Sequence, residues 1–148
     1  MTSTIRLVST IILIDLSETN TIGYIGCSAG ANLAGFGIYT TNDMPIVHVR
    51  SLKALGLVPM CINPHYHEID EAFKHMGETR DERIHQYHQY GELPVLAIFS
   101  DSYVLIQEGS ALVQGGLGAR VFRKGKEPVD VASGGDLNDL FEPSSVTL

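Results

Sequence analysis

Short apolar runs alternate with polar segments along the chain, and this pattern predicts strands alternating with helices. The expected order is a strand at 5–14, a strand at 22–27, a short helix to about residue 36, a strand at 55–62, a helix after Thr79 and a strand at 95–99. The last run is apolar throughout, which favours a central parallel strand. Shorter runs between glycines predict antiparallel hairpins at 103–106, 111–113, 119–122 and 127–132. We therefore expect an α/β fold, with a mixed, mainly parallel sheet, flanking helices and C-terminal antiparallel hairpins.

One helix carries clear start and stop signals. Thr79 is a good N-cap, and Glu82 three residues later completes a capping box. Ile84 and Tyr87 lie on one face of this helix, and Gly91 ends it. From residue 133 onward the chain is polar and rich in Gly, Ser and Asp, so we expect a loose polar tail at 133–148.

Composition narrows the functional classes. A chain of 148 residues predicts one domain, and its net charge of -7 argues against nucleic acid as a partner. Cys27 and Cys61 both lie in apolar runs, which favours buried free thiols and a reducing compartment. No apolar stretch approaches the length of a membrane span. We therefore expect a cytoplasmic protein with no membrane partner.

The residues Gly26-Cys27-Ser28-Ala29-Gly30 spell G-x-S-x-G between a strand-like run and a helix-compatible stretch. This context predicts a nucleophile elbow, a sharp turn that exposes a serine hydroxyl. The turn requires small neighbours, and the first N–H groups of the following helix can stabilise an oxyanion. Many strand–glycine–helix turns carry no chemistry, so the motif alone leaves the question open. Cys27 does not fit as the nucleophile, because Ile25 and Ala29 would then occupy the glycine positions.

A serine nucleophile needs a base, which is usually a histidine. Of the six histidines, His85 and His88 share a polar helix and are expected to be solvated. His65 and His67 follow the predicted strand at 55–62, where an α/β sheet presents functional groups. The pair lacks a third ligand at metal-binding spacing, so we expect no metal and no other cofactor. His65 is the best candidate base.

Two aspartates are candidates for the carboxylate that orients the histidine. Asp43 lies in the loop after the elbow helix, and Asp101 follows the strand at 95–99. An isolated aspartate in a loop is more often a turn former or a cap. The residues alone do not choose between Asp43 and Asp101.

Several motifs together resemble peptidase E, the aspartyl dipeptidase family of serine peptidases. The resemblance covers roughly residues 23–131. In chain order, the matching stretches are Tyr24-Ile25-Gly26-Cys27-Ser28-Ala29-Gly30-Ala31-Asn32, Thr40-Thr41-Asn42-Asp43-Met44-Pro45-Ile46-Val47, Ile62-Asn63-Pro64-His65 and Gly77-Glu78-Thr79-Arg80.

The resemblance implies a role for each matching residue. Ser28 would be the nucleophile, His65 the general base, and the N–H of Ala29 an oxyanion donor. Asp101 stands where the family typically has a glutamate as the third member, and Asp43 matches a further acidic residue with a catalytic or substrate-amine role. Arg80 matches the arginine implied to bind the aspartyl side chain of the substrate, a task suited to the two parallel hydrogen bonds of a guanidinium.

The resemblance also implies strands ahead of the elbow and a Gly-rich loop that donates an oxyanion N–H. Residues 1–22 do not match that pattern, so we expect an N-terminally shortened member with a non-matching segment at 1–22, a catalytic domain at 23–132 and the tail at 133–148. The implied activity is hydrolysis of Asp-X dipeptides through an acyl-enzyme. The alternatives are an inactive remnant that acts only by association, and a general esterase. The resemblance leaves open a homodimer.

Overall fold

The computed structural model describes residues 11–14, 23–41, 43, 45–67, 78–107 and 109–141. Its elements are β1 (Ile11–Ile14), β2 (Tyr24–Cys27), α1 (Ala29–Ala34), β3 (Cys61–Tyr66), α2 (Arg80–Tyr90), β4 (Val95–Phe99), β5 (Ser102–Gln107), β6 (Ser110–Gly115), β7 (Ala119–Phe122), β8 (Val129–Val131) and the 3-10 helix η2 (Asn138–Leu140). No helix in this part of the chain is long and apolar enough to cross a membrane.

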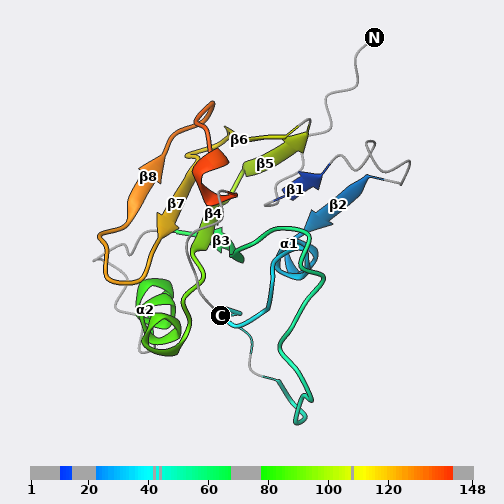
Figure 1. The fold of residues 1–148 in the computed structure, drawn as a ribbon, viewed down its shortest axis with the longest axis vertical. Helices are drawn as coiled ribbons and strands as arrows, with labels where there is room; N and C mark the ends of the chain where they lie inside the picture. The colour runs from blue at the N-terminus through cyan, green and yellow to red at the C-terminus, as the bar shows by residue number, and fades with distance from the viewer. Residues whose placement is uncertain are drawn as a thin grey trace.

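The strands form two four-stranded sheets, with the orders β2-β1-β5-β6 and β3-β4-β7-β8 (Figure 1). β1 runs parallel to β5 and β3 runs parallel to β4. The pairs β5–β6 and β7–β8 are antiparallel hairpins. α1 packs against β2 and β3, and α2 contributes Ile84 to the core beside β3 and β4. The predicted mixed α/β fold with flanking helices and C-terminal hairpins is confirmed.

β4 lies at the centre of the second sheet and separates two apolar clusters. All five of its residues are buried. Leu96 and Ile98 belong to the larger cluster, whereas Val95, Ala97 and Phe99 belong to the cluster that α2 covers. This division follows from the alternation of side chains along a strand. The predicted strand at 95–99 is confirmed with its bounds, parallel to β3 on one side and antiparallel to β7 on the other.

The capping signals of α2 are confirmed. The Thr79 hydroxyl accepts a hydrogen bond from the Glu82 N–H at 3.1 Å, and the Glu82 carboxylate accepts one from the Thr79 N–H at 2.7 Å. Gly91 is the C-cap. His88 was expected to be solvated, and here the prediction was wrong. Its side chain is 8% exposed, because it lies against the turn after the helix and its Nε2 is 3.2 Å from the Leu93 carbonyl.

The apolar segment at 55–60 is a loop, and not the strand predicted at 55–62. The strand begins at Cys61 and continues through Pro64 to Tyr66. The loop's N–H groups cap α1: Leu55 donates to the Leu33 carbonyl at 3.0 Å, and Leu57 donates to the Ala34 carbonyl at 3.0 Å. The last carbonyls of a helix need such partners, and this tertiary need overrides the local preference for a strand.

The expected loose tail packs on the core as far as residue 141. Leu137 and Leu140 are buried, and the Leu137 N–H donates to the Ala111 carbonyl of β6 at 2.9 Å. The prediction was wrong for 133–141, because two leucines in a polar segment suffice to anchor it. Residues 142–148, and residues 5–10 of the first predicted strand, lie outside the described residues. The first predicted helix ends at Ala34.

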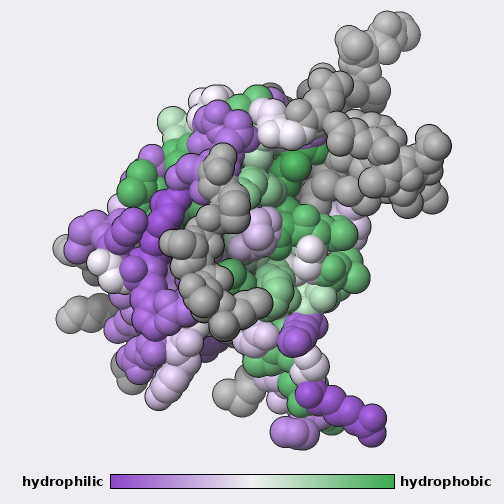
Figure 2. Space-filling model, viewed as in Figure 1, coloured by the Kyte–Doolittle hydropathy of each residue, from purple (hydrophilic) through white to green (hydrophobic). Residues whose placement is uncertain are grey.

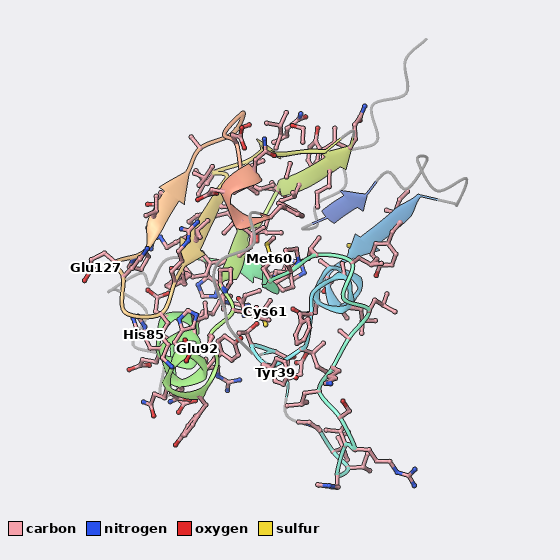
Figure 3. The ribbon with its side chains drawn as sticks, viewed as in Figure 1. Tyr39, Met60, Cys61, His85, Glu92 and Glu127 are labelled. Atoms are coloured by element: carbon pink, nitrogen blue, oxygen red, sulfur yellow. The ribbon has the colours of Figure 1, made fainter. Side chains whose placement is uncertain are left out.

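The two cysteines are both free, as predicted, but they differ in exposure. Cys61 is buried at the start of β3, near the centre of the molecule in Figure 3, and burial raises the pKa of its thiol. Cys27 is exposed, because it ends β2 at the edge of the first sheet. The expectation of a buried thiol was therefore wrong for Cys27.

Candidate catalytic site

The predicted strand–turn–helix around Ser28 is present. β2 ends at Cys27 and α1 begins at Ala29, so Ser28 alone forms the turn. Its backbone has φ 52° and ψ -117°, a conformation that residues with a side chain rarely adopt. Such strain is found where a fold holds a functional group in a fixed direction. The turn therefore has the geometry of a nucleophile elbow.

The two glycines of G-x-S-x-G differ in what the structure requires of them. A Cβ atom on Gly26 would lie 2.5 Å from the Gly30 carbonyl oxygen and 2.7 Å from a ring carbon of Tyr24. A Cβ atom on Gly30 would meet only the Tyr24 hydroxyl, at 3.9 Å. That hydroxyl donates a hydrogen bond to the Gly30 carbonyl at 2.8 Å. Close backbone approach thus excludes a side chain at Gly26 and leaves room for one at Gly30.

His65 reaches Ser28 from a bulge in β3. Asn63 is the register partner of Ala97 and Tyr66 is the partner of Phe99, so β3 has one more residue than β4 between these pairs. His65 lies within this irregularity and has φ 54°. A bulge re-aims the side chain that it carries. Here the Nε2 atom of His65 lies 3.0 Å from the Oγ atom of Ser28.

Asp101 lies at the same edge of the second sheet as His65. β3 and β4 are parallel, so their C-terminal ends lie together, and Asp101 is in the turn that follows Phe99. Its φ is 65°. In the described part of the chain, the residues other than glycine with positive φ are Ser28, His65 and Asp101. The strained positions thus coincide with the serine, the histidine and one of the two candidate carboxylates.

The turn that holds Asp101 is supported by a glycine pair that the sequence analysis did not single out. A Cβ on Gly115 would lie 2.7 Å from the Asp101 carbonyl oxygen, and one on Gly116 would lie 2.5 Å from the Ser102 hydroxyl. The buried Ser102 hydroxyl also accepts a hydrogen bond from the Gly118 N–H at 2.9 Å. The signal in the sequence is the Gly-Gly pair itself, since two adjacent glycines indicate a close backbone approach.

Arg80 is the first residue of α2 and lies against the strand that carries His65. Its Nη1 donates to the Asn63 Oδ1 at 3.3 Å and to the Pro64 carbonyl at 3.2 Å. Burial lowers the pKa of the Arg80 guanidinium, Arg83 lowers it further, and the carboxylate of Asp43 opposes both effects. Asp43 therefore lies within electrostatic reach of Arg80. Its own N–H donates to the Thr41 hydroxyl at 3.3 Å.

Asn63 joins the loop of Asp43 to the strand of His65. Its side chain is fully buried, and its Nδ2 donates to the Thr40 carbonyl at 2.7 Å while its Oδ1 accepts from Arg80. From the same loop, Tyr39 stacks on Tyr87 of α2 at 6.0 Å (Tyr39 is labelled in Figure 3). The sequence alone indicated no role for Asn63. A buried amide needs hydrogen-bond partners, which predicts a bridging role of this kind.

His67 is exposed beyond the end of β3. The described residues contain no group of three or more His, Cys, Asp or Glu side chains that could hold a metal ion. His65, the other histidine of the predicted pair, contacts Ser28.

Comparison with known proteins identifies the family of this chain. The sequence model of Peptidase family S51 matches residues 6–114. This chain belongs to peptidase family S51. Peptidase E of Streptomyces coelicolor is 43% identical over 119 residues, which are 80% of this chain and 49% of the relative. A probable alpha-aspartyl dipeptidase of Drosophila melanogaster is 40% identical over 119 residues, 80% of this chain and 50% of the relative.

The S51 chain described here thus spans about half the length of the curated relatives that it matches. The matched range differs from the expected one at both ends. It begins at residue 6, within the segment 1–22 that we expected to lie outside the family pattern, and it ends at residue 114, before the expected limit near residue 131.

Proposed function

We propose that this S51 family member is a serine-type dipeptidase that hydrolyses dipeptides with an N-terminal aspartate. The observation that carries the proposal is the 3.0 Å contact between the Ser28 hydroxyl and the His65 Nε2, made by two residues whose backbones are both held at positive φ. A hydroxyl in contact with an imidazole is the arrangement that activates serine for acyl transfer. The names of the relatives, peptidase E and alpha-aspartyl dipeptidase, support the same chemistry.

The proposed first step forms an acyl-enzyme. Ser28 Oγ attacks the peptide carbonyl carbon while His65 Nε2, unprotonated at the outset, takes the hydroxyl proton. The carbonyl oxygen becomes an oxyanion, and the backbone N–H of Ala29 donates a hydrogen bond to it. When the intermediate collapses, the C–N bond breaks and the proton on His65 passes to the leaving amine. The aspartyl group is then esterified to Ser28.

Water completes the cycle by the same route in reverse. His65 Nε2 accepts a proton from the attacking water, the ester bond breaks, and the proton returns to Ser28 Oγ. Asp101 is the proposed carboxylate that orients the imidazole, because it shares the sheet edge and the positive φ of His65. Asp43 lies near Arg80, which favours a role in substrate binding for this aspartate.

Arg80 is the proposed partner of the substrate's side-chain carboxylate. Both of its hydrogen bonds to described residues use Nη1. A half-buried guanidinium whose pKa is lowered by burial and by Arg83 gains from a second carboxylate nearby, because an anion offsets both effects. Asp43 would then face the substrate's ammonium group. A dipeptide with an N-terminal aspartate presents both charges at one end.

A second candidate function is association without catalysis. Several apolar side chains stand exposed on β2 and at the end of α1: Ile25 is 75% exposed, Leu33 45% and Phe36 44%. Figure 2 shows apolar side chains gathered on the face that carries these elements. A patch of this kind is typical of a surface that binds another protein. In this alternative the site residues would be a scaffold only.

The test is a pair of matched substrates. An Asp-X dipeptide and its Asn-X counterpart differ by one charge, and both are offered to the wild-type chain and to Ser28→Ala. We expect hydrolysis of Asp-X in preference to Asn-X, and no turnover in the variant. A monomeric, cooperatively folded wild-type sample that cleaves neither peptide would contradict the proposal and favour association.

The free thiols of Cys27 and Cys61 support a cytosolic location for the enzyme.

A further inference from the structure

The first turn of α2 contacts β3 on both sides of His65. On one side, Arg80 Nη1 donates to the carbonyl of Pro64, the residue before the histidine, at 3.2 Å. On the other side, Asp81 Oδ1 accepts a hydrogen bond of 2.6 Å from the hydroxyl of Tyr66, the residue after it. Two consecutive helical residues therefore hold the two neighbours of His65.

Tyr66 is held rigidly in this arrangement. Its side chain is 1% exposed, and its ring packs edge-on against Phe99 at 5.0 Å and against Phe122 at 5.9 Å. Burial raises the pKa of the phenol, and the Asp81 carboxylate raises it further, so the hydroxyl stays protonated. A protonated phenol has one hydrogen to donate. Because Arg120 can only donate to this hydroxyl, the hydrogen goes to the Asp81 carboxylate, 2.6 Å away.

The hydrogen bond continues across the second sheet through Arg120. This residue of β7 donates from Nη1 to the Tyr66 hydroxyl at 3.0 Å, and its guanidinium grips Asp130 of β8 through both carboxylate oxygens. The guanidinium carbon also lies 5.6 Å from the centre of the Tyr66 ring. The Tyr66 hydroxyl is thus both donor and acceptor in one chain from Asp130 to Asp81. Linked hydrogen bonds of this kind strengthen one another.

The His65 bulge needs this support. A histidine at φ 54° is strained, and such a conformation persists only where its surroundings over-determine it. If the bulge relaxed, the imidazole would turn away from the serine hydroxyl. We propose that Tyr66 and Asp81, together with Arg80, are positioning residues that hold the His65 bulge so that Nε2 reaches Ser28 Oγ. This inference rests on the proposed function for its catalytic meaning, but its geometric content stands apart from it.

The competing explanation is that the Tyr66 hydroxyl only stabilises the core. In that case its removal lowers the free energy of unfolding and leaves the contact between His65 and Ser28 intact. A positioning role predicts loss of the contact in a protein that remains folded. The experiment must therefore report directly on the contact between His65 Nε2 and Ser28 Oγ.

The readout is the NMR signal of the His65 imidazole nitrogens. In a chain that is otherwise wild type, Ser28→Ala removes the hydroxyl that contacts His65 Nε2 and therefore shifts the resonance of that nitrogen. Tyr66→Phe and Asp81→Ala should each abolish this response, because the imidazole has already left the serine. Asp81→Asn should preserve it, since an amide oxygen still accepts from the tyrosine. Tyr103→Phe is the matched control, because it removes a hydroxyl that donates at 2.6 Å to Gln114 in the other sheet.

The labelling rate of Ser28 by a fluorophosphonate gives a second measure. We expect Tyr66→Phe and Asp81→Ala to lower it roughly tenfold to a hundredfold, as misplacement of a catalytic group by about 1 Å does. The control and Asp81→Asn should stay near the wild-type rate. If Tyr66→Phe fails to fold, the two Asp81 variants decide the matter alone.

The proposal is overturned if the His65 signal of both disruptive variants still responds to Ser28→Ala, or if Tyr103→Phe loses the response to the same extent. The proposed function is judged separately. A wild-type chain that shows the NMR response but cleaves no dipeptide would sink the dipeptidase and leave the positioning role in place.

Discussion

Ser28 Oγ lies 3.0 Å from His65 Nε2, although 37 positions separate the two residues in the chain. Each side chain is aimed by local strain, at the turn after β2 for the serine and at the bulge of β3 for the histidine. Two independent distortions that converge on one short contact are a feature that packing alone does not require.

Asp101→Asn should depress turnover far more than substrate affinity. An asparagine keeps the shape of the side chain but favours the wrong imidazole tautomer, and in a Ser-His-Asp triad that exchange lowers kcat by about 10⁴. We expect the KM for an Asp-X dipeptide to change little. Steady-state kinetics beside Asp43→Asn, which should mainly raise KM, provides the comparison. The opposite pattern, with kcat lost in the Asp43 variant, would assign the orienting role to Asp43.

Gly26→Ala and Gly30→Ala should separate sharply in stability. The alanine methyl at position 26 meets a backbone carbonyl at 2.5 Å, and overpacking of this kind typically costs about 1–3 kcal/mol or more. At position 30 the methyl has space within a helix, where alanine gains up to about 1 kcal/mol over glycine. Urea denaturation of both variants measures the difference. Equal destabilisation would show that the elbow tolerates a side chain at position 26.

The charge on Arg80 should govern discrimination between Asp-X and Asn-X. Arg80→Lys keeps a cation but loses the planar pair of donors, so we expect preference for Asp-X to fall by roughly tenfold or more. The ratio of kcat/KM for the two dipeptides measures it. An unchanged ratio would show that Arg80 does not recognise the substrate. A fall in kcat alone would indicate that Arg80 acts only by holding β3 in place.

Stability should decrease as the pH is lowered through the titration range of His88. Burial lowers the pKa of this imidazole below its ordinary value of 6.5. Between that value and the lower native pKa, the unfolded chain binds more protons than the native protein, so the free energy of unfolding rises with pH. The contribution is complete above pH 6.5 and is lost as the pH falls through the native pKa.

In His88→Gln the glutamine amide still donates to the Leu93 carbonyl but does not titrate. The drop in urea midpoint between about pH 8 and about pH 5.5 should therefore be smaller in the variant than in the wild-type chain. The same drop in both proteins would place the pH dependence elsewhere.

The sequence predicts those parts of the site that local spacing determines. The elbow follows from small residues around Ser28, and the start of α2 follows from the reciprocal bonds of Thr79 and Glu82. Both are decided within a few residues of the chain. The position of His65 after an apolar run also made it the best candidate base, and the family resemblance implied the same role.

The remainder depends on contacts that are distant in sequence. The apolar sequence at 55–60 predicts a strand, but its N–H groups donate to the carbonyls at the end of α1, and the segment is therefore a loop. Likewise, the bulge at His65 depends on the register with β4, and the burial of Leu137 depends on β6. No local pattern carries these facts. The strand prediction therefore placed His65 beyond a strand end, whereas it lies inside β3.

An acyl-enzyme on Ser28 can be detected from the intact mass of the chain, quenched in acid during turnover of an aspartyl ester. We predict a mass increase of one aspartyl group in the wild-type chain, and no increase in Ser28→Ala or in His65→Gln, where no base activates the hydroxyl. Turnover without an adduct, retained in Ser28→Ala, would contradict a nucleophilic role for Ser28.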